Sequence, residues 1–339
     1  MQLVKLTLLT VIAACSLLAE AEGRLRVLAW PGYADPDVVS AFEQQTGAKV
    51  DVTFVDTDDA LWEKVRLHDG QDFDVVAVNT AELQRLIDFE LVQALPLAQI
   101  PNIQQQLKRF HQVKGISRAG SRYAVPFTFS EMGLIYNKRL ISTPPTSMAA
   151  LWDKQYQGRI ALHEGSPHNF SLTALVMGTG NPFQISQAQF PRVVNRLVAL
   201  RANRPHFYSS PDDAVTLFRN HDIALMFGNF GSQQVRLLKK AGFDVGYVIP
   251  KEGALAWLDC WAMLRGASDR NLAAAWINHM SSVEVGHILT ERQGLANTQE
   301  PWPGIRDKDR IVWLQPVENS EQRNRYWARI LSGSRKGMF

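Results

Sequence analysis

The sequence predicts an α/β protein of two lobes, each with a mainly parallel sheet flanked by helices. Its 339 residues are enough for about two domains, each with a core of its own. Strand patterns and helix patterns alternate along both halves of the chain, which is typical of parallel sheets covered by helices. Two extended stretches, 124–137 and 250–264, could each pass from one lobe to the other. We therefore expect a hinge with two or three crossings.

The first half begins with a strand, a helix and a second strand. RLRVLAW (24–30) is apolar like a buried strand, and KVDVTFV (49–55) alternates and is rich in β-branched residues. Between them, Asp35 is the expected helix cap, Pro36 suits the first helical turn, and Gly47 is expected to end the helix. The pattern continues with a helix around 58–68, a strand over 73–78 and a helix over 80–89.

The second half repeats this alternation. GRIALHE (158–164) indicates a strand, and Pro211 in a first turn indicates a capped helix over 209–220. The other expected elements are a helix over 170–178, a strand over 221–227, a helix over 231–242 and a strand over 243–250. Two α/β units of similar size are therefore expected.

Residues 1–21 are expected to be a secretory signal peptide. They combine a lysine, an apolar core and an A-x-A exit at Ala19–Ala21, and they are too short to span a membrane as a mature helix. IAAC (12–15) also resembles a lipobox, so cleavage near Ala21 and acylation of Cys15 both stay open. Either outcome exports the chain and leaves Cys260 without an intramolecular disulfide partner.

Composition and motifs argue against several classes of function. The formal net charge of +3 is too small to indicate a nucleic-acid partner or an anionic membrane. The histidines and cysteines lack metal-site spacing, and we find no serine nucleophile elbow and no phosphate-binding loop. Glu131, Glu164 and Asp259 could serve acid–base chemistry, but nothing in the sequence favours that over binding. We expect no enzymatic activity, no metal and no cofactor.

Five stretches in the same order resemble the periplasmic polyamine-binding proteins, the spermidine and putrescine receptors of ABC uptake systems. The resemblance runs from about Leu25 to Asn297 and is weaker in the C-terminal tail. The stretches are LRVLAWPGYADPDVVSAFEQQTGAKV (25–50), HDGQDFDVVAVNTAELQRL (68–86), YAVPFTFSEMGLIYN (123–137), TSMAALWDKQYQGRIAL (146–162) and VIPKEGALAWLDCWAM (248–263).

The resemblance implies a periplasmic binding protein fold of type II-like topology. Lobe 1 would comprise 24–128 and 257–298, and lobe 2 would comprise 131–250 and 301–339. A small-molecule amine would bind in a cleft between the lobes, and a membrane ABC permease would receive it. The protein would be a periplasmic monomer, with a lipid anchor if Cys15 is acylated.

An alkyl polyamine is a chain of methylenes interrupted by cations, so aromatic rings and carboxylates suit it. Trp30 and Tyr33 match the family's first aromatic pair, although they could also merely cover the sheet edge. Trp257 and Asp259 match its W-x-D, although a buried ring and a helix-capping carboxylate are the plainer alternative. Phe227 stands where the family has a tryptophan.

Other positions depart from the family. Thr80 lies where a tyrosine is missing, and HEGSPHNF (163–170) keeps only Glu164 of a pair of acids, with His168 and Asn169 near the second acid's place. Glu131 is an acid that the resemblance does not imply; it could replace a lost carboxylate or pair with an arginine. The identity of the amine therefore stays open.

The primary interpretation is a solute-binding protein that captures a polyamine-like cation and delivers it to an ABC permease. The alternative is a periplasmic polyamine sensor that reports occupancy to a membrane protein controlling cyclic-di-GMP. Neighbouring genes for a permease or for a cyclase would distinguish the two.

Overall fold

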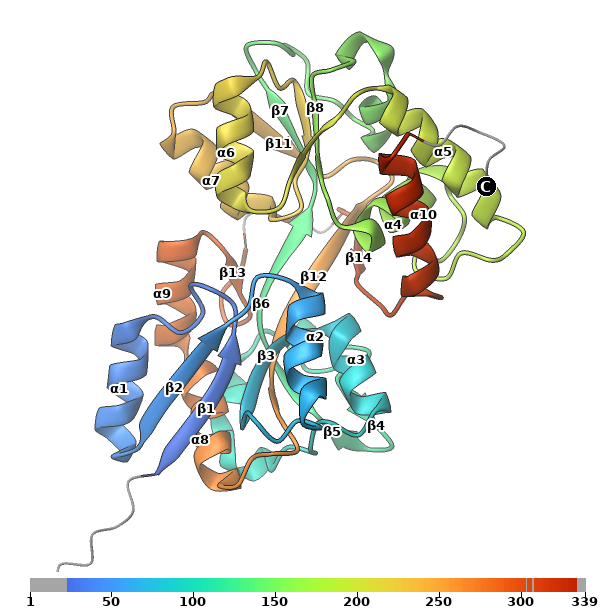
Figure 1. Ribbon diagram of the computed structural model, residues 1–339. Coiled ribbons are helices and arrows are strands. Elements are labelled where there is room, and N and C mark those ends of the chain that lie inside the picture. Colours follow the sequence, from blue (N-terminus) through green and yellow to red (C-terminus); the bar gives the residue numbers. More distant parts are fainter. Residues whose placement is uncertain (1–22, 303, 307, 334–339) are drawn as a thin grey trace, which may run out of the picture.

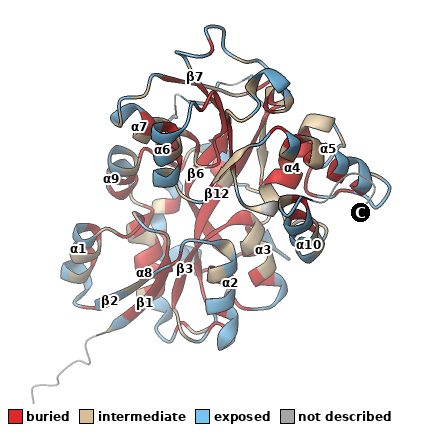
Figure 2. Cartoon of the chain, turned by 45° about the horizontal axis from the view of Figure 1, so that its top comes forward, coloured by how far each residue is buried: buried red, intermediate tan, exposed pale blue. Residues whose placement is uncertain are grey.

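The computed structural model describes residues 23–302, 304–306 and 308–333, and the expected signal peptide, with Cys15, lies outside these residues. Figure 1 shows two lobes joined by the long strands β6 (Ala124–Met132) and β12 (Ala254–Met263). Both strands are buried along almost their whole length (Figure 2). Within the described part of the chain, no helix is long and apolar enough to cross a membrane.

Lobe 1, the lower lobe in Figure 1, contains the larger sheet. Besides β6 and β12, its strands are β1 (Arg24–Ala29), β2 (Lys49–Phe54), β3 (Val75–Asn79), β13 (Ala296–Asn297) and β14 (Ile311–Trp313). The strand order is β13-β6-β12-β3-β1-β2, and β14 also pairs with β12. The strands β1, β2 and β3 are parallel, as the alternation predicts, whereas β12 runs antiparallel to β3 and β6.

Five helices cover the two faces of this sheet. They are α1 (Pro36–Thr46), α2 (Asp58–Leu67), α3 (Thr80–Asp88), α8 (Arg270–Met280) and α9 (Val283–Gln293). Helices α1, α8 and α9 bury one face, with Phe42, Trp261 and Trp276 in that core. Helices α2 and α3 bury the other face around Trp62 and Leu86. Helices α8 and α9 are additions to the elements expected from the sequence.

The ends of α1 show how local signals act. Gly47 ends the helix in the left-handed conformation, with φ of 73°, and its N–H donates to the Glu43 carbonyl oxygen at 2.8 Å. Asp35 occupies the expected N-cap position but makes no side-chain capping bond. Its carboxylate instead accepts a hydrogen bond from Arg292 at 3.0 Å, which ties the start of α1 to the end of α9.

Lobe 2 contains a five-stranded sheet of order β11-β7-β10-β8-β9. Its strands are β7 (Leu134–Asn137), β8 (Ile160–His163), β9 (His206–Tyr208), β10 (Leu225–Phe227) and β11 (Val245–Val248). Its helices are α4 (Ser166–Met177), α5 (Phe190–Ala202), α6 (Pro211–Asn220), α7 (Gly231–Lys240) and α10 (Ser320–Leu331). A small hairpin, β4 (Ser117–Arg118) and β5 (Ser121–Arg122), lies apart from both large sheets.

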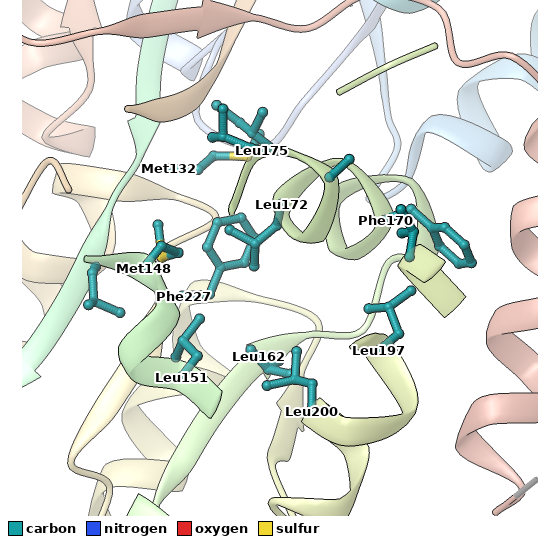
Figure 3. Packing of buried hydrophobic residues seen from close by; sticks show 14 of the residues in the cluster. Met132, Met148, Leu151, Leu162, Phe170, Leu172, Leu175, Leu197, Leu200 and Phe227 are labelled. Carbon is teal, nitrogen blue, oxygen red and sulfur yellow. The ribbon is translucent and has the colours of Figure 1, made fainter. Parts of the chain in front are cut away.

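The larger core of lobe 2 lies between its sheet and helices α4, α5 and α10, and a smaller one lies between the sheet and helices α6 and α7. Leu172 and Leu175 from α4, Leu197 and Leu200 from α5, and Phe227 from β10 all belong to the larger core (Figure 3). The sequence patterns do not predict α5, α10 or β9. They also place the start of α4 at 170, whereas the helix starts at 166, where Pro167 suits its first turn.

Both sheets are mixed, because the strands that connect the lobes add antiparallel pairs to the parallel ones. The chain leaves lobe 1 between β6 and β7 and returns between β11 and β12. It passes to lobe 2 once more after β14, since α10 packs on α4 and α5. Three crossings agree with the expected hinge.

Arg323 holds the C-terminal helix on lobe 2. Its side chain is fully buried and binds both carboxylate oxygens of Glu318, at 2.9 and 2.6 Å. It also donates to the Pro167 carbonyl at 3.1 Å and to Ser171 Oγ at 2.8 Å, both on α4. This guanidinium therefore connects α10 to the beginning of α4.

Replacing Arg323 by alanine should lower the free energy of unfolding by about 3–5 kcal/mol, because Glu318 would become a largely buried carboxylate without a cation. Urea unfolding would measure this. Arg325→Ala is the matched control, since Arg325 is exposed on the same helix and should change stability by less than about 0.5 kcal/mol. Equal effects of the two substitutions would contradict this role of Arg323.

Candidate functional site

The candidate site lies where β1 and β3 end and their helices begin, beside β12. Trp30 and Tyr33 occupy the turn after β1, and Thr80 begins α3 directly after β3. Trp257 and Asp259 are two residues apart on β12, so their side chains are on the same face of the strand. In open α/β sheets, ligands bind at the carboxyl ends of parallel strands, which is the position that these residues share.

Tyr33 and Asp259 are in direct contact. The Tyr33 hydroxyl donates to Asp259 Oδ2 at 2.6 Å, and both side chains are buried. Burial raises the pKa of Asp259 to about 7, and the hydrogen bond from Tyr33 only partly opposes this rise. No ion pair to Asp259 occurs among the described residues. A bound cation would therefore supply the positive partner that the Asp259 carboxylate lacks.

Asp58 is a second acid in the candidate site, and it is not among the residues that the sequence analysis predicts. Asn79 donates to Asp58 Oδ1 at 2.8 Å and is the direct cross-strand partner of Asp259 on β12. Burial, together with the nearby charges of Glu82 and Asp259, raises the pKa of Asp58 well above its usual value. Within the described chain, Asp58 also has no ion-pair partner.

The signal for Asp58 was present in TDD (57–59), which follows β2. We read these residues only as a helix start, and Thr57 does cap α2 by accepting a hydrogen bond from the Ala60 N–H at 3.1 Å. Because Thr57 supplies the cap, Asp58 is left available to Asn79. An acid just past the end of a parallel strand could have been recognised as a site candidate on that position alone.

Two tryptophans lie beside these acids. Trp257 is half-buried, packs against cores of both lobes, and donates from Nε1 to the Asn229 carbonyl oxygen at 3.2 Å. Trp30 is also half-buried, and its buried indole N–H has no hydrogen-bond partner in the part of the chain that the structure describes. Trp257 therefore connects the acids of lobe 1 to Asn229 of lobe 2.

Glu131 lies on the opposite face of the crossing strands. It pairs with Ala256 on β12, and the next pair on that face, Phe129 with Leu258, belongs to the core under α2 and α3. Trp257 and Asp259 alternate with these residues and so point the other way. In this conformation the Glu131 carboxylate does not share a face with Asp259.

The Glu131 carboxylate is fully buried, and neither of its oxygens has a hydrogen-bond partner among the described residues. Burial raises its pKa to about 7, against the opposing influence of the nearby Tyr247 hydroxyl and Trp302 indole. The arginine considered as a partner is not found, since no described residue forms an ion pair with Glu131. Tyr247 instead donates to the Glu131 backbone oxygen at 2.6 Å.

The other candidate residues make contacts of their own rather than with the acids. Phe227 is fully buried in the core of lobe 2 (Figure 3), so its ring is out of a ligand's reach in this conformation. Thr80 is buried and donates to the Leu314 carbonyl oxygen at 3.0 Å. Glu164 is exposed, and its backbone oxygen accepts from Trp327 Nε1 at 2.7 Å. Their roles as ligand contacts stay predictions.

The lobes also touch outside the site. Ser232 on α7 donates to the Gly294 carbonyl oxygen at 3.0 Å, and Arg236 on α7 donates to the Thr290 carbonyl oxygen at 3.2 Å. Both acceptors lie at the end of α9 in lobe 1. In the described part of the chain, no group of three or more His, Cys, Asp or Glu side chains could hold a metal ion.

Comparison with known proteins identifies a family and several relatives. A model of the bacterial extracellular solute-binding protein family matches residues 37–298. The putrescine-binding periplasmic protein PotF of Escherichia coli K12 is 22% identical over 93% of both chains. The spermidine/putrescine-binding periplasmic protein 1 of Haemophilus influenzae is 23% identical over 80% of this chain and 74% of its own. The resemblance read from the sequence is thereby confirmed.

Solved structures confirm the two-lobe fold. The Tp0655 (TpPotD) lipoprotein of Treponema pallidum superposes with a TM-score of 0.78 at 16% identity, covering 91% of this chain and 99% of its own. The spermidine/putrescine ABC transporter substrate-binding protein PotD of Streptococcus pneumoniae gives a TM-score of 0.75 at 18% identity, covering 92% and 99%.

Replacing Glu131 by glutamine should stabilise the protein at high pH. The folded-state pKa of about 7 exceeds the usual 4.5, so the folded protein binds the proton more tightly and loses stability as pH rises between these values. We expect a gain of up to about 3 kcal/mol at pH 8 and about 1 kcal/mol or less at pH 5.

Urea unfolding at both pH values would measure the effect, with the exposed Glu63→Gln as control. The same change at pH 5 and pH 8 would show that the charge of Glu131 is not responsible.

Proposed function

The chain belongs to the family of bacterial extracellular solute-binding proteins, and from this premise we propose that its solute is a polyamine-like cation held at Asp259. The observation that carries the proposal is a pair of acids, Asp58 and Asp259, without cationic partners among the described residues. An ammonium group between them would satisfy both by charge-assisted hydrogen bonds.

The rings beside the acids suit the rest of such a ligand. Trp30 and Trp257 are both half-buried, so part of each ring remains available for contact. Indole faces attract cations and cover methylene groups, and each such contact contributes about 0.5–2 kcal/mol. Tyr33 would keep the Asp259 carboxylate in place through their hydrogen bond.

Binding would draw the lobes together. Trp257 packs on both lobes and is bonded to Asn229, so a ligand against this ring also acts on the contact between lobes. The crossing at Gly133 is tight, because a Cβ there would lie 2.6 Å from the Tyr247 ring and from the Val248 carbonyl oxygen. We place the hinge at the crossing strands on either side of this glycine.

We further propose that a periplasmic monomer delivers the ligand to a membrane ABC permease. The names of the relatives support this, since several are periplasmic binding proteins and one is the substrate-binding protein of an ABC transporter. Signal cleavage near Ala21 and acylation of Cys15 both agree with that place of action.

Isothermal titration with putrescine, cadaverine, agmatine, spermidine and N-acetylputrescine should reveal one-to-one binding of at least one amine, after unfolding and refolding remove any bound ligand. Because Asp259 must be ionised and its pKa is about 7, the affinity should fall about 10-fold from pH 8 to pH 6.

Asp259→Asn should weaken binding at least about 10-fold, since a charge-assisted hydrogen bond is lost. Glu63→Gln, exposed in the same lobe, is the control and should not change the affinity. Unchanged binding in Asp259→Asn would refute the site, and the absence of any binding would refute the proposed ligand class.

Delivery to a permease can be tested in cells. Deleting the gene should lower uptake of the radiolabelled amine, and the native gene, but not the Asp259→Asn variant, should restore uptake. Normal uptake in the deletion strain would contradict a transport role and favour sensing.

A further inference from the structure

We infer that the ligand carries a single cationic end and that its other end is an uncharged hydrogen-bond donor, such as an amide N–H. The inference rests on the proposed function, because it concerns which amine the site around Asp259 accepts. It follows from the unequal charges at the two ends of the site.

The end in lobe 1 is strongly acidic. Asp259 and Asp58 lack cationic partners among the described residues, and they are linked through the pairing of Asn79 with Asp259 and its hydrogen bond to Asp58. Glu82 adds a third carboxylate, although Arg85 lies 3.4 Å from it. This end can stabilise one ammonium group without help from elsewhere in the chain.

The opposite end is reached through Trp257. Its indole N–H donates to the Asn229 backbone oxygen at 3.2 Å, and the Asn229 side-chain oxygen lies 2.7 Å from His168 Nδ1. His168 lies at the start of α4 and is half-buried. Asn229 lies between it and the Trp257 ring. The ring and these two polar groups would contact the part of the ligand that enters lobe 2.

His168 offers an acceptor rather than a negative charge. Because Asn229 Oδ1 accepts, Nδ1 of His168 carries the proton, and in the neutral ring Nε2 keeps a lone pair. A lone pair can receive an N–H or O–H from the ligand. It cannot offset a second ammonium charge, and a protonated imidazole would repel one.

Among the described residues, the surroundings of His168 offer no buried carboxylate that is free to bind a cation, since Glu318 is paired with Arg323. Asn169 donates its amide to the backbone oxygens of His163 and Gly165, at 2.6 and 2.8 Å. Glu164, the only acid in 163–170, is exposed and forms no ion pair with a described residue. Burial lowers the pKa of His163 to about 3 and also lowers that of His168, where the charge of Arg323 contributes.

A second cation would therefore enter a region in which, among the described residues, the Glu318 carboxylate is already paired with Arg323 and no other buried carboxylate adjoins His168. Arg323 is paired with Glu318 and donates to the backbone oxygen of Pro167, the residue before His168. A diamine requires a carboxylate at each end of the site, and the end at His168 lacks one. A monoacylated diamine fits both ends.

The test compares putrescine with N-acetylputrescine. Both have the same four-carbon chain, but putrescine carries two positive charges and N-acetylputrescine carries one. Titration of the full mature protein should give at least 10-fold tighter binding of N-acetylputrescine. His168→Glu should reverse this preference, because it adds the missing carboxylate. The neutral control His168→Gln should keep the preference of the native protein.

Asn229→Asp adds a negative charge beside His168 and should also shift the preference toward putrescine. The test therefore does not depend on the folding of a single variant. Tighter binding of putrescine by the native protein would overturn the inference and leave the proposed function standing. An unchanged preference in both acidic variants would also overturn it. If no amine binds in an Asp259-dependent way, both proposals fail.

Discussion

The antiparallel pairing of β6 with β12 is the interaction on which the rest of the structure depends. It extends from Ala124 opposite Ala262 to Met132 opposite Leu255, with an irregularity beside Asp259. The same two strands form the centre of the lobe 1 sheet and continue toward lobe 2, so one ladder fixes a core and a hinge together. Any shift of one residue in this register would exchange the two faces of the ribbon and move Asp259 away from Tyr33.

The ladder also separates two buried acids that behave differently. Asp259 has a hydroxyl donor and lies beside Asn79, Asp58 and partly exposed rings, so a cation can compensate it. The Glu131 carboxylate has no hydrogen-bond or ion-pair partner among the described residues and faces the core below α2 and α3. Burying an uncompensated carboxylate costs several kcal/mol or forces protonation. The fold therefore tolerates two destabilising carboxylates, and the proposed function gives a role to Asp259 alone.

Sequence patterns predict several residues of the candidate site because these residues lie in local motifs. The W-x-D spacing puts Trp257 and Asp259 on one strand face, and the turn after β1 brings Tyr33 to Asp259. Asp58 was missed because TDD also reads as a helix start. The resemblance implies a ligand contact at Phe227, which stands where the family has a tryptophan. Its depth in the core depends on α4 and on α5, a helix that the sequence patterns do not predict.

The sequence by itself determined the alternating strands and helices, the end of α1 at Gly47, and the family, because these depend on neighbouring residues and on ordered motifs. Only the tertiary structure decided which face of the crossing strands carries Glu131, which acid joins Asp259, and that His168 meets Trp257 through Asn229. Each of these depends on strand register and lobe contacts between residues far apart in the chain. No local periodicity encodes such distances, since alternation along a strand fixes relative faces but not what covers them.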